Sequence, residues 1–233
     1  MKPIYEVYDR EIGLKGKAYI ALRRCDVEQA GRVLRQELEN LSAQGAKEIF
    51  VTSSDPALLL REGDYPGYSL RFAREMVRME RGLSSLPEGG GIRLESLTGA
   101  RQEEWLALHN ESFFDMPNSA TYGPEELEER QGPEHVTAFA LANGEPVGVC
   151  ELDLSCRPPE IEGIGLLPRC RGKGLGRALL HAAMAELAAR SYERCQLLVA
   201  SDNRRARTLY ERTGFRETGV QSRWFRLLPN PEK

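Results

Sequence analysis

Apolar residues in the first part of the chain follow a helical spacing and then an extended one. After Asp26, a residue type common at helix N-termini, apolar positions recur every three or four residues as far as Leu41, and Gly45 follows as a helix stop. Runs rich in β-branched and aromatic residues predict strands over residues 5–8, 18–22 and 48–53. Residues 1–88 are therefore predicted to form a small α/β unit.

Two segments at the end of this part are less regular. Leu70 to Arg81 fits either a helix or a bulged strand, because its apolar residues satisfy both spacings, and we expect a strand. Leu83 to Gly91 contains one proline and three glycines, which predicts a linker. A second domain is then expected over residues 91–228.

The second domain alternates strands and helices, which is typical of the α/β class in the broad sense that includes α+β. Asn143 and Gly144 lie between two strand patterns and are a strong hairpin signal. The expected strands cover residues 92–97, 136–141, 146–154, 161–167 and 196–200, with two more between 215 and 228. The expected helices cover residues 101–114, 124–130, 175–190 and 203–213.

Composition narrows the classes of function. Hydrophobic residues make up 41% and charged residues 29% of the chain, and no apolar run is long enough for a membrane span, so we expect no membrane partner. A net charge of −3 disfavours a nucleic-acid partner. Five cysteines without paired short spacing, and no apolar signal segment, predict a cytoplasmic protein with reduced thiols. Three scattered histidines predict no metal site.

A cationic glycine turn lies between a strand pattern and a helix pattern. Pro168 ends the strand because it lacks an N–H, and the glycines that follow let the backbone approach a ligand closely. Amides at a helix N-terminus, flanked by cations, suit a pyrophosphate group. The predicted phosphate-binding cradle consists of Arg171, Gly172, Lys173, Gly174, Leu175, Gly176 and Arg177.

The spacing of the cradle excludes two common nucleotide loops. A Walker loop needs Ser or Thr after its Gly-Lys, where this chain has Gly174, and a Rossmann loop needs two residues before its last glycine, where only Leu175 stands. The cradle resembles instead the Arg/Gln-x-x-Gly-x-Gly loop of the GNAT acetyltransferase superfamily, which binds the pyrophosphate of acetyl-coenzyme A. Residues 199–215 are similar to a second family motif, the Asn…Ala…Tyr…Gly-Phe helix, through Asn203 and Tyr210.

This resemblance extends over residues 91–228 and implies the GNAT fold, a mixed, mostly antiparallel sheet flanked by helices. It implies an N-acetyltransferase with acetyl-coenzyme A as cosubstrate and an amine-bearing acceptor, either a small molecule or a protein. Backbone amides of Leu166 and Leu167 would then bind the thioester arm and polarise its carbonyl. Asn203 would contact the pantetheine arm, and Tyr210 would protonate the departing sulfur.

Two carboxylates are candidates for the base that takes a proton from the amine. Glu160 and Glu162 share strand parity with Leu166, so that either can face the same cleft. Glu162 is the first choice, and the choice between the two stays open. His109 and His181 are expected to be ordinary surface or partly buried helix residues without a role.

Other interpretations of these features stay open. The domain can hold an acyl-coenzyme A as a sensor without turnover, or transfer a larger acyl or aminoacyl group. Residues 1–88 look like an incomplete GNAT unit without the cradle, so we expect them to pack against or shape the acceptor site and not to bind the coenzyme. The identity of the acceptor and the formation of a homodimer are also left open.

Overall fold

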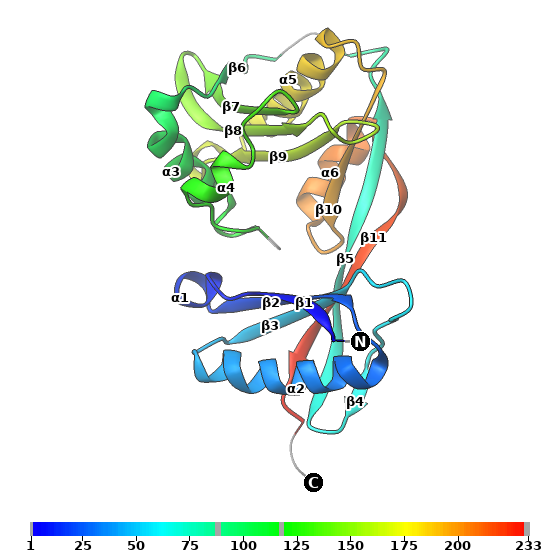
Figure 1. The fold of residues 1–233 in the computed structure, drawn as a ribbon. Helices are drawn as coiled ribbons and strands as arrows, with labels where there is room; N and C mark the ends of the chain where they lie inside the picture. Colours follow the sequence, from blue (N-terminus) through cyan, green and yellow to red (C-terminus); the bar gives the residue numbers. More distant parts are fainter. Residues whose placement is uncertain (1, 87–89, 117–118, 231–233) are drawn as a thin grey trace. The chain divides into compact units, whose positions relative to one another are not determined.

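The structure, a computed structural model, describes residues 2–86, 90–116 and 119–230 of the chain. Internal contacts divide the chain into two units, whose elements Figure 1 labels and colours along the sequence. Unit 1 consists of residues 1–76 and 220–233, and unit 2 consists of residues 77–219. Two long strands, β5 (Tyr68–Gly82) and β11 (Arg216–Leu228), contribute residues to both units.

The limits of these units differ from those of the domains that the sequence predicts. Residues 77–90 group with unit 2, and the last part of β11 groups with unit 1. The middle of the predicted linker, residues 87–89, lies outside the described residues. The domain division at residues 88–91 therefore stays a prediction.

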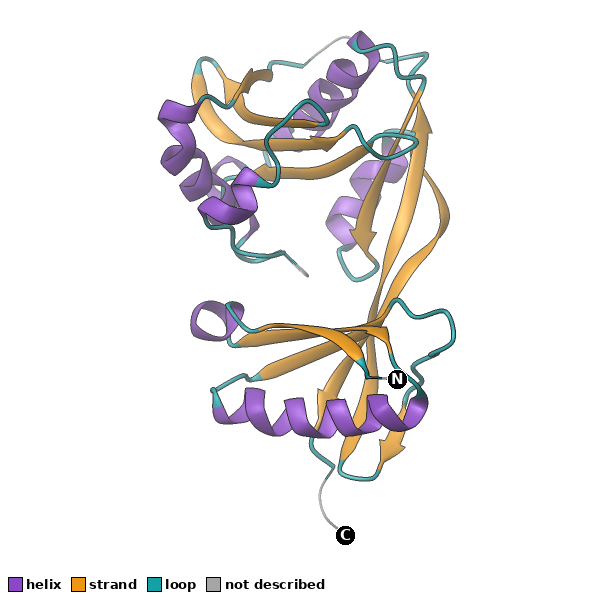
Figure 2. Ribbon diagram, viewed as in Figure 1, coloured by secondary structure: helices purple, strands orange, loops and turns teal. Residues whose placement is uncertain are grey.

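Unit 1 is a sheet with one long helix packed along it (Figure 2). Its elements are β1 (Ile4–Tyr8), α1 (Glu11–Lys15), β2 (Lys17–Arg24), α2 (Val27–Ala43), β3 (Glu48–Ser53) and β4 (Gly63–Tyr65), with parts of β5 and β11. The strand order is β1-β2-β3-β11-β5, and β4 pairs with β5. The strand expected over residues 70–81 is confirmed by β5. The short helix α1 lies between β1 and β2 and ends at Gly16, which has φ 68°.

The N-terminus of α2 is closed by its own sequence. The carboxylate of Asp26 accepts a hydrogen bond from the N–H of Gln29 at 2.8 Å, and the side chain of Gln29 accepts one from the N–H of Asp26 at 3.1 Å. This capping box satisfies two amides that a helix start leaves unpaired. Because the cap is itself an anion, this helix start is unsuited to binding a phosphate.

Unit 2 is a sheet with helices on both faces (Figure 2). Its elements, besides parts of β5 and β11, are β6 (Arg93–Ser96), α3 (Gln102–Phe113), α4 (Pro124–Glu128), β7 (His135–Ala142), β8 (Glu145–Asp153), β9 (Glu160–Leu166), α5 (Leu175–Ala189), β10 (Arg194–Ala200) and α6 (Arg204–Arg212), with 3₁₀ turns at Gly99–Arg101 and Pro168–Cys170. The strand order is β5-β10-β9-β8-β7-β6.

The core of unit 2 lies on both faces of this sheet. On one face α5 buries Leu179, Met184 and their neighbours against apolar side chains of β7, β8 and β9, and α6 adds partly buried residues. On the other face α3 and α4 bury Trp105 and Leu127. Strands β6 to β9 pair antiparallel, and β9 pairs parallel with β10. The predicted α/β class with a mixed, mostly antiparallel sheet is confirmed.

Two pairs of parallel strands in the described residues differ in the length over which they are hydrogen-bonded. In unit 1, β2 and β3 stay in register from Lys17 opposite Glu48 to Leu22 opposite Ser53. In unit 2, the register between β9 and β10 within the described residues consists of Glu160 opposite Gln196. Past Glu160, β9 keeps its pairing with β8 but leaves its other edge open. Unit 2 therefore has an opening between two strands of its sheet.

Candidate functional site

The predicted cradle forms a turn between β9 and α5. A 3₁₀ turn at Pro168–Cys170 follows β9, and Gly172 and Gly174 then both have φ 80°, a left-handed conformation that favours glycine. Helix α5 begins directly after Gly174, and no side chain in the described part of the chain caps it. This helix start, unlike that of α2, leaves its donors to an outside partner.

Five consecutive backbone amides of the cradle, those of residues 172–176, have no acceptor among the described residues. A Cβ placed on Gly172 or Gly174 would meet nothing within 4 Å, so the space beside the turn is open. Lys173 and Arg177 are exposed, and the described part of the chain provides no ion pair for either. The cradle thus offers clustered N–H donors, two cations and the positive end of a helix.

Arg171 differs from these two cations because its guanidinium is already engaged. Its Nε donates to the carbonyl of Leu166 at 3.0 Å, and its Nη2 donates to the carbonyl of Ser112 at 2.9 Å. Both Nη atoms donate to the carboxylate of Asp115, at 2.6 and 3.0 Å, and this pair lowers the pKa of Asp115. The sequence suggests a free phosphate-binding cation at Arg171, and the structure shows a side chain only 13% exposed, each of whose three nitrogens donates to a protein acceptor.

The open edge of β9 presents one of the two predicted backbone amides. The N–H of Leu167 donates to the carbonyl of Val147 at 2.9 Å, so this amide is used by the sheet and the prediction for Leu167 is corrected. Hydrogen-bonded pairs alternate along an antiparallel ladder, and the peptide groups of Ile164 and Leu166 therefore face away from β8. The amide of Leu166 lies on the open edge.

Helix α6 carries the other two residues implied by the resemblance. The side chain of Asn203 caps the helix by accepting from the N–H of Ala206 at 3.2 Å, and its Nδ2 lies 3.9 Å from the sulfur of Met116. Tyr210 packs on the core, with its ring centroid 5.9 Å from that of Phe215. Its hydroxyl has no hydrogen-bond partner among the described residues. Burial raises the pKa of Tyr210 to about 12, so the phenol carries its proton at neutral pH.

Side chains from three elements meet at the start of α5. A Cβ added to Gly176 would lie 3.7 Å from Leu209 of α6 and 3.9 Å from Leu166 of β9. The open edge of β9 and the helix that carries Tyr210 therefore both lie beside the cradle. Unit 2 brings these separately predicted parts of the site together.

The candidate carboxylates do not follow the predicted strand parity. Glu162 has no partner in the register between β8 and β9 and forms a β-bulge. A single extra residue turns the positions before it to the other face of the strand. Leu166 packs on the α5 side of the sheet, whereas Glu162 forms an ion pair at 3.1 Å with Arg130, which follows α4 on the opposite side. The shared parity of Glu160 and Glu162 with Leu166 is therefore wrong.

The two carboxylates also differ in their electrostatic surroundings. Burial, and after it the charges of Glu162 and Asp153, raise the pKa of Glu160 to about 7. Burial raises the pKa of Glu162 as well, and Arg130 opposes that shift. Glu160 has no ion pair within the described residues, while Glu162 does. Glu160 is thus the carboxylate that changes charge near neutral pH.

His109 is fully buried, whereas the sequence predicts an ordinary surface or partly buried helix residue. Its Nε2 lies 3.3 Å from Oε2 of Glu151, and the two residues are 3% and 2% exposed. The ring of His109 stacks on Tyr122, with centroids 3.9 Å apart, and on Trp105 at 5.1 Å. The signal was present in the sequence, because His109 lies four residues after Trp105 and so shares its buried helix face.

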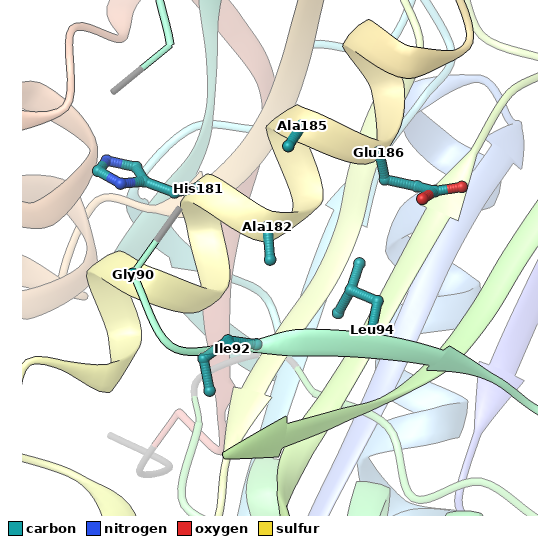
Figure 3. A pocket seen from close by; sticks show the side chains of 7 residues that line it. All are labelled: Gly90, Ile92, Leu94, His181, Ala182, Ala185 and Glu186. Carbon is teal, nitrogen blue, oxygen red and sulfur yellow. The ribbon is translucent and has the colours of Figure 1, made fainter. Parts of the chain in front are cut away.

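A pocket of about 300 Å³ lies between α5 and β6 (Figure 3). Its lining is mostly small and apolar: Gly90, Ile92, Leu94, His181, Ala182, Ala185 and Glu186. Burial, and after it the charges of Arg177 and Arg81, lower the pKa of His181. None of the predicted site residues lines this pocket, so it is separate from the cradle.

The described residues were also compared with the requirements of a metal site and of a membrane-spanning helix. They contain no group of three or more His, Cys, Asp or Glu side chains arranged to hold a metal ion, and the absence of a metal stays a prediction. Among the described helices, none is both long and apolar enough to cross a membrane.

Comparisons with known proteins place these features in context. Residues 97–215 match the model of the acetyltransferase (GNAT) family. The mycothiol acetyltransferase of Thermobispora bispora is 34% identical over 192 residues, which cover 72% of this chain and 64% of that protein. The mycothiol acetyltransferase of Beutenbergia cavernae is 31% identical over 190 residues, which cover 70% of this chain and 64% of that protein. The chain thus spans just under two thirds of the length of these relatives.

A solved structure shows the same fold. The GCN5-related N-acetyltransferase from Sphaerobacter thermophilus aligns with a TM-score of 0.59 at 20% identity. The alignment covers 97% of this chain and 75% of that one, so the likeness includes both units.

Proposed function

Because this chain belongs to the acetyltransferase (GNAT) family, we propose that it transfers the acetyl group of acetyl-coenzyme A to a primary amine. The proposal rests mainly on the five backbone amides of residues 172–176, which have no acceptor among the described residues and lie at the positive end of α5. Such a row suits a pyrophosphate, and Lys173 and Arg177 add two exposed cations. We expect micromolar affinity for coenzyme A, measured by calorimetry.

The residues around the cradle can supply the steps of the transfer. Acetyl-coenzyme A would supply an activated acetyl group, and coenzyme A would leave as a thiolate when the bond between the acetyl carbon and sulfur breaks. The open-edge amide of Leu166 is suited to donate to the thioester carbonyl, and Tyr210, protonated at neutral pH, to give a proton to the departing sulfur. Glu160 lies on the sheet face opposite Leu166, so it would take the proton of the amine through water. Its pKa of about 7 lets it lose a proton near the working pH.

The acceptor is proposed from the relatives. The aligned proteins from Thermobispora bispora and Beutenbergia cavernae are named mycothiol acetyltransferases, and we propose mycothiol-related amines as the first acceptors to test. An assay of acetyl transfer to a panel of amines decides between enzyme and sensor. Binding of acetyl-coenzyme A without acetylation of any amine would favour a sensor.

The first prediction separates the two candidate bases. Glu160→Gln should lower kcat/KM by about 10²-fold, while Glu162→Gln, which removes a carboxylate already paired with Arg130, should have a smaller effect. In the unaltered protein kcat/KM should rise as pH increases through about 7, because Glu160 must lose its proton to act as the base. Initial rates between pH 5.5 and about 9 measure this limb. If kcat/KM still rises with pH in Glu160→Gln, Glu162 becomes the preferred candidate for the base.

A second prediction concerns the number of coenzyme sites. Calorimetry should give one coenzyme A per chain, because unit 1 lacks both features of the site in unit 2. Its parallel strands β2 and β3 stay paired, and the carboxylate of Asp26 occupies the start of α2. A stoichiometry of two would show that unit 1 binds the coenzyme without a glycine cradle.

A further inference from the structure

The C-terminal end of α3 is held to the cradle and to α6 at three places. Glu111 pairs with Arg169 at 3.1 Å, Asp115 pairs with Arg171, and Met116 lies against Asn203. The three contacts are unequal. The side chains of Arg169 and Glu111 are 65% and 51% exposed, whereas Arg171 is 13% exposed beside a 59% exposed Asp115 and also donates to two backbone carbonyls. Exposed pairs of the first kind contribute little to stability, so the Arg171 contact dominates.

The guanidinium of Arg171 links three chain segments at one point. It donates hydrogen bonds to a carbonyl of β9, to a carbonyl in the last turn of α3 and to the carboxylate of Asp115 just beyond that helix. The last carbonyls of a helix lack partners within it and favour a cation. Arg171 thus completes the end of α3 while its own backbone belongs to the cradle.

Moving this side chain to a bound phosphate would break all of these bonds. The carbonyls of Leu166 and Ser112 would lose a charged donor in a largely buried place, and Asp115 would lose its partner. The cradle does not need the extra cation, because residues 172–176 already offer unpaired amides and two exposed cations flank them.

We propose that Arg171 is a positioning residue, which keeps its bonds to Leu166, Ser112 and Asp115 when coenzyme A is bound and transmits that binding to residues 112–116. The proposal rests on the proposed function, because it needs coenzyme A in the cradle. Its consequence is that the segment leaving α3 becomes more rigid when the coenzyme is bound.

Hydrogen exchange of the full chain, with and without coenzyme A, tests the proposal. In the unaltered protein coenzyme A should slow exchange both at residues 172–180 and at residues 112–116, the latter by about fivefold. In Asp115→Asn and in Arg171→Lys the slowing at 172–180 should remain, and the slowing at 112–116 should be lost. Asp115→Glu, which keeps a carboxylate, should restore part of it.

The affinity for coenzyme A distinguishes this proposal from a competing mechanism, in which Arg171 leaves Asp115 and binds the phosphate. If Arg171 were released to bind phosphate, Asp115→Asn would free it and tighten coenzyme binding. Our proposal expects Kd to stay within about threefold in that variant. Glu111→Gln is the matched control, since it removes the exposed neighbouring pair and should behave like the unaltered protein in both measurements.

Three results would overturn the proposal. Faster exchange at residues 112–116 on adding coenzyme A would mean that Arg171 is released. Coenzyme-dependent slowing that survives in both variants would mean that another contact carries the effect. No change at residues 172–180 in the unaltered protein would remove the coenzyme from the cradle and refute the proposed function itself.

Discussion

Replacing Tyr210 with phenylalanine should lower kcat by roughly 10²–10⁴-fold while the affinity for coenzyme A changes little. The substitution keeps the ring, which packs against the core of unit 2 near Phe215, and removes only the hydroxyl. Because that hydroxyl has no protein partner among the described residues, its loss breaks no bond within them. The expected fall in rate is therefore specific to proton donation.

Tyr192→Phe is the matched control for this prediction. Tyr192 is also partly buried against the same core and lies between α5 and β10, and no role in the transfer is assigned to it. Steady-state rates and calorimetry on both variants give kcat and the coenzyme Kd. An unchanged kcat in Tyr210→Phe would remove the phenol from the mechanism and leave solvent as the proton source.

The second large effect is expected at the cradle. Gly174→Asp should weaken coenzyme A binding by at least about 100-fold, because it puts a carboxylate at the positive end of α5, where a phosphate is expected. The fold should survive, since an added Cβ meets no atom within 4 Å. Calorimetry measures the binding, and circular dichroism confirms that the secondary structure is retained.

A glycine with similar geometry elsewhere separates charge from backbone strain. Gly144 has φ 85°, close to the 80° of Gly174, and is equally open around its Cα. It belongs to the turn between β7 and β8. Gly144→Asp should therefore carry a similar conformational cost and leave coenzyme binding unchanged. Equal binding by Gly174→Asp and the unaltered protein would contradict the assignment of the cradle.

The sequence predicted those parts of the site whose signal lies within a few residues. The glycines, the cations and the helix start of the cradle are contiguous, so their spacing alone indicates a turn that ends in unpaired amides. Asp26 likewise indicates the start of α2, because its side chain caps the N–H of Gln29 only three residues later. Such features depend on local backbone geometry, which the residue types determine directly.

Features that depend on distant partners were not predictable in this way. The pairing of Arg171 with Asp115 joins residues 56 positions apart in sequence, and no local pattern marks it. The bulge at Glu162 adds one residue to a strand without changing its composition, yet it reverses the face of the carboxylates. For His109 the helical spacing was informative, but its ion-pair partner Glu151 comes from another strand.

The divergence of β9 and β10 has a cost in the stability of the fold. Unit 1 shows the alternative, because β2 and β3 stay together over six positions and complete their ladder. Each backbone hydrogen bond that β9 forgoes contributes about 0.5–1.5 kcal/mol in an ordinary sheet. An unpaired strand edge is also a surface that other extended chains can join, which folded proteins normally cover. The unpaired edge of β9 therefore lowers the stability of unit 2. A ligand that hydrogen-bonds along this edge would complete the sheet as an extra strand would.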